Sequence, residues 1–193
     1  SPELLATEAT ALERKWLKET VGCQDQLLTA FGGINRIIFR PDGGWMISRV
    51  PSARLNDYLM LFFTGIQRNA TDVAASYVGK MNERASLLKR IRVMVDEGEA
   101  ILRGGVLPDF GRLLDEAWQV KRQLGHGVSN PRIDSIYETG KRAGAIGGKI
   151  LGAGGGGFML FFVPPDAQPA VRSALDGLIE VPFLFEEEGS MVV

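Results

Sequence analysis

The sequence predicts an α+β fold, because apolar runs of strand length are interspersed with segments of helical periodicity and no long repeat occurs. Of the 193 residues, 45% are hydrophobic and 23% are charged, which is the balance of a globular chain with a proper core. Two runs, "YLMLFF" and "FMLFFV", have the continuous apolar character of buried strands. Clusters of glycine and proline separate these runs from the helical segments.

Charge and cysteine content narrow the class of protein. The 22 basic and 23 acidic residues give a formal net charge of -1, which argues against nucleic acid as the main partner. The single cysteine, Cys23, cannot form an internal disulfide, so we expect a reducing, cytoplasmic location. The chain begins at Ser1 without a signal peptide, and we expect it to be a processed or truncated piece of a longer protein.

The glycine-rich run "GGKILGAGGGGFMLFF" admits three interpretations. A membrane helix would suit the nearly uncharged range 145–163, but its seven glycines and the following Pro164-Pro165 disfavour a helix. A dinucleotide fingerprint is met formally by Gly152-x-Gly154-x-x-Gly157, yet a β-rich run follows where that motif needs a helix. We therefore predict a strand, a loop and a strand, with a donor-rich loop backbone that lies against phosphate or another loop.

The remaining elements follow from capping and turn signals. Ser1-Pro2-Glu3 predicts the start of a helix that continues to about Lys18, and Val21–Gly33 encloses a shorter helix. The runs "INRIIF" and "WMISRV" flank a turn signal at 41–44, which predicts a hairpin. After Pro51 we expect a strand from Tyr58, followed by helices near 71–77, 87–102, 110–124, 132–143 and 167–175, and a last strand region at 181–193.

Four motifs in this order resemble the GHMP kinases, the superfamily of galactokinase, homoserine kinase and mevalonate kinase. They are "VGCQDQLLTAFGG", "YLMLFFTGIQRNA", "SNPRIDSIYETGKRAGA" and "GGKILGAGGGGFMLFF". Within the superfamily the resemblance is nearest to the D-glycero-D-manno-heptose 7-phosphate kinases. It implies that residues 1–50 end the N-terminal domain and that residues 51–193 form the C-terminal domain. The first two family motifs, including the serine-rich loop that holds ATP and magnesium, do not occur in the sequence.

The resemblance implies a kinase that uses ATP and Mg2+ to phosphorylate the anomeric hydroxyl of D-glycero-D-manno-heptose 7-phosphate. We expect a sugar phosphate and ATP as partners, no nucleic acid and no membrane, and a homo-oligomer is compatible with the sequence. Another GHMP sugar kinase, such as a galactokinase-like enzyme, and a non-catalytic sugar-phosphate-binding module remain as alternatives. Because the main nucleotide motifs are missing, we expect the isolated chain to be inactive and to expose an apolar face.

The resemblance also assigns roles to residues. Asp25 corresponds to the aspartate that acts as catalytic base or positions the acceptor hydroxyl, although capping of a helix N-terminus is the commoner task for aspartate. The third family motif contains five glycines that help to form the nucleotide phosphate site, although close packing alone could require them. These cofactor-binding candidates are Gly152, Gly154, Gly155, Gly156 and Gly157.

Substrate-binding candidates come from two polar stretches. Thr64, Gly65 and Arg68 follow the apolar run, and the Arg68 guanidinium could hold a phosphate through paired hydrogen bonds or simply lie on the surface. Ser129 and Asn130 precede a predicted helix and could contact substrate or only cap that helix. The sequence suggests no metal ligands, and we interpret Lys149 as an ordinary lysine of an edge strand.

Overall fold

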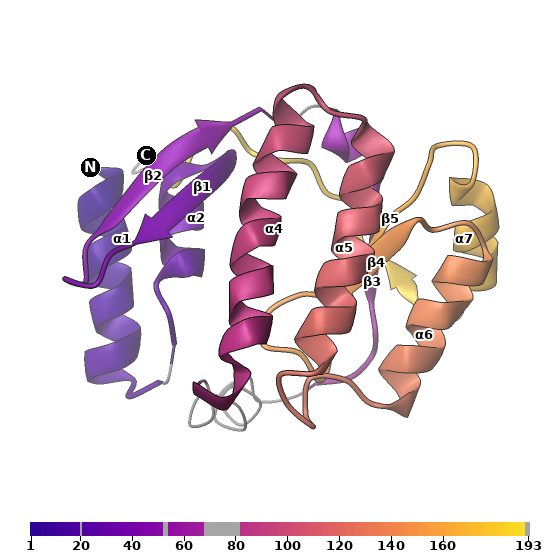
Figure 1. Ribbon diagram of the computed structural model, residues 1–193, viewed down its shortest axis with the longest axis horizontal. Helices are drawn as coiled ribbons and strands as arrows, with labels where there is room; N and C mark the ends of the chain where they lie inside the picture. Colours follow the sequence, from indigo (N-terminus) through magenta and orange to yellow (C-terminus); the bar gives the residue numbers. More distant parts are fainter. Residues whose placement is uncertain (20, 52–53, 68–81, 192–193) are drawn as a thin grey trace. The chain divides into compact units, whose positions relative to one another are not determined.

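The computed structural model describes residues 1–19, 21–51, 54–67 and 82–191, drawn in colour in Figure 1. The chain divides into two compact units, one formed by Ser1–Ser52 with Leu184–Val193 and the other by Ala53–Phe183. The helix predicted near 71–77 lies outside the described residues. Among the residues described, no helix has both the length and the apolar character needed to cross a membrane.

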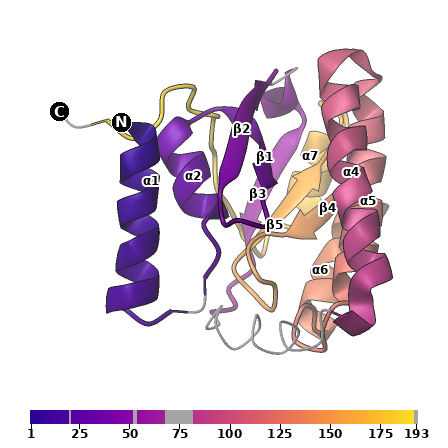
Figure 2. The ribbon, with the colours of Figure 1, turned by 60° about the vertical axis from the view of Figure 1, so that its left-hand side comes forward.

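Two helices open the first unit. Helix α1 (Pro2–Ala11) begins as predicted, because the Ser1 side chain accepts a hydrogen bond from the Leu4 N–H at 3.4 Å and proline occupies the first turn. A π-helical turn, η1 (Leu12–Trp16), extends it. Helix α2 (Gln24–Phe31) lies beside α1 (Figure 2). The two helices enclose a small apolar core of Ala6, Leu27 and Ala30.

A β-hairpin follows, as the turn signal predicted. Strands β1 (Ile34–Phe39) and β2 (Trp45–Val50) pair antiparallel, from Ile34 opposite Val50 to Phe39 opposite Trp45. The Trp45 ring meets the Phe31 ring edge to face, with centroids 5.6 Å apart, and so packs the hairpin against the end of α2. The hairpin therefore shares its apolar contacts with the helices of the first unit.

The last described residues return to the first unit without forming a strand. The prediction of a strand region at 181–193 is wrong for the described residues 181–191, and the short strand β6 (Ile179–Glu180) ends before it. The backbone of this segment bonds at separate points, where the Gly33 N–H donates to the Glu186 carbonyl at 2.6 Å and the Ser190 N–H donates to the Thr29 carbonyl at 3.0 Å. The segment therefore makes isolated hydrogen bonds with residues near the end of α2 and, over its described residues, does not form a ladder with a strand.

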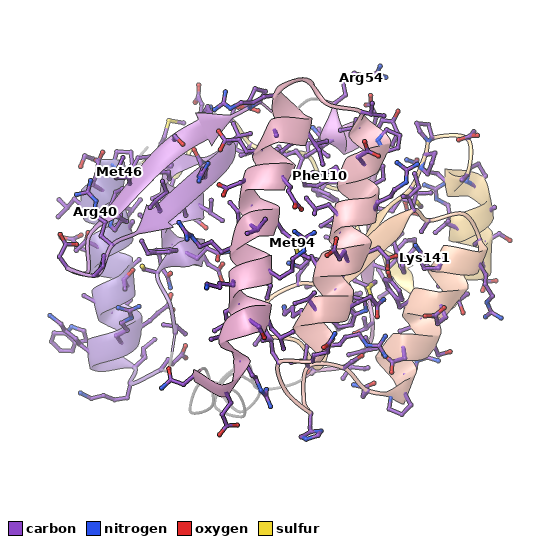
Figure 3. The ribbon with its side chains drawn as sticks, in the orientation of Figure 1. Arg40, Met46, Arg54, Met94, Phe110 and Lys141 are labelled. Carbon is purple, nitrogen blue, oxygen red and sulfur yellow. The ribbon has the colours of Figure 1, made fainter. Side chains whose placement is uncertain are left out.

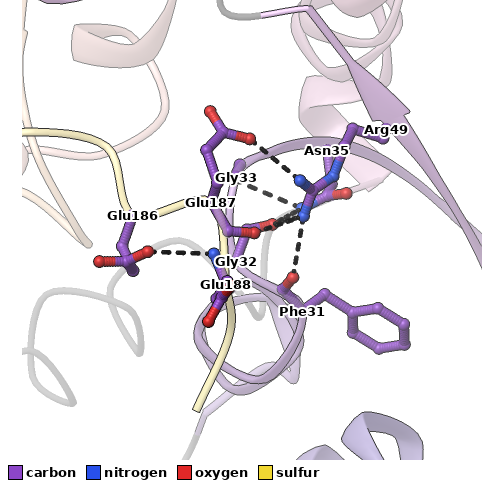
Figure 4. A network of polar contacts seen from close by, with 8 residues as sticks. All are labelled: Phe31, Gly32, Gly33, Asn35, Arg49, Glu186, Glu187 and Glu188. Carbon is purple, nitrogen blue, oxygen red and sulfur yellow. Dashed lines mark hydrogen bonds and ion pairs between the residues drawn. The ribbon is translucent and has the colours of Figure 1, made fainter. Parts of the chain in front are cut away.

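Arg49 holds this returning segment (Figure 4). Its guanidinium donates to the backbone carbonyls of Phe31, Gly32 and Glu187 at 3.2, 3.2 and 2.8 Å, and it pairs with the Glu187 carboxylate at 3.0 Å. Asn35 supports the same corner by donating to the Gly32 carbonyl at 2.6 Å. Since the ion pair is half exposed, most of the stabilisation comes from the three carbonyl contacts.

The second unit is built on an antiparallel sheet. Strands β3 (Leu59–Phe63), β4 (Gly147–Ile150) and β5 (Phe158–Phe162) join β6 in the order β4-β5-β3-β6. The apolar runs that predicted buried strands are β3 and β5, which occupy the centre of the sheet. Strand β4 is an edge strand, as expected for the strand that carries Lys149.

Four helices lie in the described part of the second unit. They are α4 (Ala85–Gly104), α5 (Leu107–Arg122), α6 (Pro131–Arg142) and α7 (Gln168–Ala174), with short 3-10 turns η2 (Leu55–Asp57) and η3 (Asn82–Arg84). Helices α4 and α5 run side by side (Figure 1). Glycines let two helices approach β5, because a Cβ atom at Gly111 would lie 2.6 Å from the Phe162 ring and one at Gly140 would lie 2.5 Å from the Phe161 ring.

A polar network ties α5, α6 and β4 together. The Asp115 carboxylate accepts from the Tyr137 hydroxyl and, at 3.2 Å, from Lys141, which is labelled in Figure 3. Lys141 also donates to the Ile146 carbonyl. Burial alone would raise the pKa of Asp115, but the Tyr137 hydrogen bond and the Lys141 charge together lower that pKa below its ordinary value. The ionised carboxylate is therefore an anchor for the helix pair.

Replacing Arg49 by alanine should loosen the C-terminal segment. The loss of three carbonyl contacts should raise the rate at which thermolysin cleaves within residues 184–191 by about tenfold, which corresponds to roughly 1.4 kcal/mol of local stability. The control is Glu187→Gln, which removes the ion pair but keeps the backbone contacts, and its cleavage rate should stay near that of the wild type. Equal cleavage of wild type and Arg49→Ala would contradict this role.

Candidate functional site

The glycine-rich run forms a loop between β4 and β5, as predicted. Residues 151–157 connect the two strands, and the loop holds φ angles of +65° at Gly152, +111° at Gly154, +78° at Gly155 and +83° at Gly157. Residues with a Cβ atom rarely adopt such angles. Four of the five glycine candidates are therefore required by the backbone conformation of the loop itself.

Two glycines are also required by close contacts. A Cβ atom at Gly154 would lie 2.7 Å from the Val128 carbonyl oxygen, and one at Gly156 would lie 2.6 Å from the Ile66 carbonyl oxygen. By contrast, a Cβ atom at Gly152 would meet nothing within 4 Å. One part of the loop is thus pressed against neighbouring backbone and another part faces open space, so packing explains some of the glycines and not all of them.

Hydrogen bonds connect the loop to two of the predicted substrate-binding residues. The Gly155 N–H donates to the Val128 carbonyl at 2.9 Å, and Asn130 donates to the Gly155 carbonyl at 3.3 Å. The buried Thr64 hydroxyl donates to the Gly157 carbonyl at 2.8 Å, and the Thr64 N–H donates to the same oxygen at 2.9 Å. The structure therefore brings Thr64 and Asn130 to the glycine loop, where both side chains position its backbone.

Some amides of the loop have no partner. The N–H groups of Gly154 and Gly156 make no hydrogen bond within the ranges that the structure describes, although Gly156 is buried. Unpaired backbone N–H groups are costly when buried, and successive amides in a turn of this kind form concave sites for anions. The loop can therefore offer donors to a phosphate oxygen.

Two lysines lie against the same loop. Lys121 at the end of α5 donates to the Gly152 carbonyl at 2.5 Å, and Lys149 occupies β4 just before the loop. Burial, together with the nearby positive charge of Lys149, lowers the pKa of Lys121 to about 8. Burial also lowers the pKa of Lys149. Neither lysine has a carboxylate partner among the described residues, and with a pKa of about 8 Lys121 is mostly protonated at neutral pH.

The other residues of the two polar stretches have different surroundings. Ser129 donates to the Asp134 carboxylate at 2.5 Å, and Asn130 caps α6 by accepting from the N–H groups of Arg132 and Ile133. Gly65 has a φ angle of +74° and open space around it. Arg68 lies outside the described residues. The capping role considered for Asn130 is confirmed, and it coexists with the contact to the glycine loop.

Asp25 lies in the first unit, in the first turn of α2. Its side chain is exposed and makes no hydrogen bond within the described residues, so the capping role considered for it is not seen there. It lines a cavity of about 320 Å³ together with Glu13, Gln26 and other residues of α1, α2 and the returning segment. Gln26 donates to Glu13 at 2.7 Å, while the side-chain Oε1 atom of Gln26 is buried without a hydrogen-bond partner among the described residues. An open carboxylate beside a cavity can accept a proton from a bound hydroxyl group.

A magnesium site needs several oxygen ligands gathered in one place. Within the described residues, no three His, Cys, Asp or Glu side chains gather where they could hold a metal ion. The glycine loop has a donor set that suits phosphate oxygens, whereas magnesium prefers carboxylate and carbonyl oxygens. The described residues therefore fit an anionic group and do not fit Mg2+.

Comparison with known proteins shows which family this chain resembles. Residues 99–178 match the family model described as "GHMP kinases C terminal". Over 202 residues the chain is 33% identical to the D-glycero-alpha-D-manno-heptose 7-phosphate kinase of Campylobacter jejuni, and the match covers 96% of this chain and 57% of that enzyme. Residues 99–178 are thus similar to the C-terminal domain of GHMP kinases. The predicted resemblance and the α+β fold class are both confirmed.

Two further relatives extend the comparison. The chain is 37% identical over 121 residues to the L-fucokinase/L-fucose-1-P guanylyltransferase of Bacteroides fragilis, with 60% of this chain and 12% of that protein covered. The crystal structure of a D-glycero-D-manno-heptose 1-phosphate kinase from Bacteroides thetaiotaomicron has a TM-score of 0.68 and 26% identity, with 95% of this chain and 52% of that chain covered. The chain thus spans about half the length of the heptose kinases that it matches.

The part matched by the GHMP kinase model contains the glycine loop, Lys121, Ser129 and Asn130, whereas Asp25 and Thr64 lie outside it. Sequence reasoning missed Lys121 as a neighbour of the loop. A signal was present, since Lys121 follows the buried Trp118 by three residues and so shares its helix face. The contact of Lys121 with Gly152 depends on the sheet register and could not be seen in the sequence.

Adding a methyl group at the packed glycines should destabilise the protein. Gly156→Ala and Gly154→Ala would each force a Cβ atom against a carbonyl oxygen and should lower the free energy of unfolding by about 1–3 kcal/mol. Gly104→Ala is the control, since it ends α4 with nothing within 4 Å, and it should be neutral or slightly stabilising. Urea denaturation measures all three, and a Gly156→Ala variant as stable as the wild type would rule out the packing constraint.

Lys121 should titrate near pH 8 in an NMR titration of labelled lysine side chains. Because its folded pKa lies below the ordinary 10.5, the native state holds fewer protons between these values, and this group makes the free energy of unfolding rise as pH increases from 8 to 10.5. Lys149→Met should raise the Lys121 pKa by removing a like charge, whereas Lys89→Met on the exposed side of α4 should not. An unchanged midpoint in Lys149→Met would refute this coupling.

Proposed function

We propose that the chain is part of a GHMP kinase that transfers the γ-phosphoryl group of ATP to the anomeric hydroxyl of D-glycero-D-manno-heptose 7-phosphate. The observation that carries the substrate is the 33% identity to the Campylobacter jejuni heptose 7-phosphate kinase over 96% of this chain. Residues 1–50 would then end the N-terminal domain and residues 51–193 would belong to the C-terminal domain. The division of the chain near Ser52 supports the proposed domain boundary between residues 50 and 51.

Asp25 is the catalytic residue in this proposal. Its carboxylate accepts the proton of the anomeric hydroxyl while that oxygen forms a bond to the γ-phosphorus, and the bond between the γ-phosphorus and the bridging oxygen breaks to release ADP. The exposed, unbonded carboxylate and the adjacent cavity support this role. Phosphoryl transfer depends mainly on the alignment of the reactants and on compensation of negative charge. One positioned base is therefore enough to accept the proton of the attacking hydroxyl group.

The glycine loop supplies a phosphate contact in the same proposal. The unpartnered N–H groups of Gly154 and Gly156 would donate to phosphate oxygens, while Thr64 and Asn130 keep the loop in the conformation that presents them. Since the described residues do not fit Mg2+, the upstream half of the enzyme would have to hold that ion, which compensates charge on ATP. Arg68 and Gly65 stay proposed as substrate contacts, and the cytoplasm is the proposed location.

An unphosphorylated sugar is the second candidate for the acceptor. The 37% identity to a protein named as an L-fucokinase covers 121 residues of this chain, so an unphosphorylated sugar is an alternative acceptor. Of the two acceptors, only the heptose 7-phosphate carries a phosphate group. A phosphotransfer assay that compares heptose 7-phosphate with L-fucose and galactose therefore separates the two proposals.

Asp25→Asn should abolish most turnover in the enzyme that combines this chain with the upstream half found in its relatives. The amide keeps the size of the carboxylate but cannot accept the proton, so kcat with heptose 7-phosphate should fall by roughly 100-fold or more while nucleotide affinity changes little. Glu13→Gln, on the same cavity, is the matched control, and the isolated 193-residue chain gives the inactive baseline. Near-normal kcat in a folded Asp25→Asn variant would remove Asp25 from the mechanism.

A further inference from the structure

A second cavity, of about 410 Å³, lies within the second unit and differs from the cavity beside Asp25. It opens where α5 ends and α6 begins, next to η3. Its lining consists almost entirely of polar side chains and turn residues, namely Arg84, Arg122, Gln123, Gly125, His126, Ser129, Asn130, Pro131 and Asp134. Since most ligand sites are largely apolar, a cavity with this lining suits a small and strongly polar ligand.

The charge of the lining is positive. Two guanidinium groups, from Arg84 and Arg122, face a single carboxylate, Asp134, and His126 is the remaining ionisable side chain on the wall. With a neutral imidazole the lining carries one net positive charge. Asp134 is engaged on both sides, because it accepts from Ser129 at 2.5 Å and pairs with Arg122 at 3.1 Å. It therefore positions these two side chains in the cavity wall.

Arg122 is held in place by contacts that leave some of its N–H donors free. Its guanidinium donates to Gln119 at 3.2 Å, pairs with Asp134, and lies over the Trp118 ring at 6.0 Å from the centroid. A guanidinium carries five N–H donors, and these contacts occupy only some of them. A side chain fixed in this way loses little conformational entropy when it binds a ligand.

The second cation of the lining, Arg84, has a donor that the described residues leave unsatisfied. Its Nη1 atom is buried and has no hydrogen-bond partner within the part of the chain that the structure describes. A buried charged donor without an acceptor is costly, and such groups in native proteins call for an explanation. An anion seated in the cavity would provide that acceptor.

The N-terminus of helix α6 adds a positive electrostatic potential that favours an anion in the cavity. Helix α6 has 12 residues, and its N-terminal residues Asn130 and Pro131 line the cavity. Asn130 already caps the first N–H groups, so the side chains would make the direct contacts while the helix dipole favours negative charge. Asn130 also donates to the Gly155 carbonyl, so the cavity wall and the glycine loop share a residue.

We infer that this cavity binds a phosphate monoester through the guanidinium groups of Arg84 and Arg122. A phosphate monoester carries nearly two negative charges at neutral pH, and arginine binds its oxygens through paired hydrogen bonds. The assignment rests on the proposed function, in which the acceptor is a sugar that carries such a group. The cavity thereby selects a phosphorylated sugar over a free one.

Binding to the 193-residue chain tests the cavity without any catalysis. Inorganic phosphate should shift the amide NMR signals of residues 122–134 with a dissociation constant in the millimolar range or below, at constant ionic strength. Arg84→Gln and Arg122→Gln should each weaken binding about tenfold. Arg132→Gln, an exposed residue in the first turn of α6 that does not line the cavity, removes the same charge nearby and should change binding less than twofold.

Arg84→Lys is a control for loss of folding, because lysine keeps the positive charge but cannot form the paired hydrogen bonds. This variant should bind phosphate with intermediate affinity and keep the melting temperature of the wild type. Equal affinities in wild type and Arg84→Gln, or an equal loss in Arg132→Gln, would overturn the inference. The source of the phosphate is decided by parallel titrations with heptose 7-phosphate, the free heptose and ADP. Arginine-dependent binding of heptose 7-phosphate supports the assignment, whereas such binding by ADP alone would overturn it.

Kinetics separate this inference from the proposed function. In the enzyme with its upstream half, Arg84→Gln should raise KM for heptose 7-phosphate about tenfold while KM for ATP and kcat change little. A wild-type enzyme that phosphorylates no sugar phosphate would defeat the proposed function and leave the phosphate titrations to decide the cavity. An active enzyme with an unchanged KM in Arg84→Gln would defeat the cavity assignment alone.

Discussion

The second unit depends on a backbone approach that only glycine permits. Gly154 and Gly156 bring the β4–β5 loop against the carbonyl groups of Val128 and Ile66, at separations where any side chain would collide. This contact joins three segments that are distant in sequence, since Ile66 follows β3 and Val128 precedes α6. The amides that remain unpaired, and the side chains that hold the loop, owe their positions to it.

Some positive charges of the second unit have no carboxylate partner among its described residues. Lys121 and Lys149 beside the loop lack carboxylate partners among the described residues, and Arg84 keeps a buried donor unsatisfied. Elsewhere in the same unit cations are paired, as Arg90 is with Glu97 and Glu116. Unpaired cations lower stability when they are partly buried, so their clustering at the loop and the neighbouring cavity indicates a surface adapted to an anionic ligand.

Much of the fold could be read from local signals. The cap at Ser1, the hairpin around 41–44 and the central strands β3 and β5 follow from capping chemistry, turn residues and apolar runs. The returning segment was misread because its apolar residues suit a strand, while its actual partners, Gly33 and Arg49, are more than 130 residues away in sequence. The site was partly foreseeable as a list of residues, but which hydroxyl or amide meets which carbonyl depends on tertiary contacts.

The returning segment also has a consequence for biosynthesis. The first unit consists of residues from before and after the second unit, so its helices and hairpin leave the ribosome long before the segment that Arg49 holds. Until residues 184–191 are translated, the Gly33 N–H, the Thr29 carbonyl and the Arg49 donors that meet Glu187 have only water as a partner for those contacts. The second unit, whose residues are contiguous, can fold in the meantime. The two units should therefore mature out of order, with the first unit completed after the second.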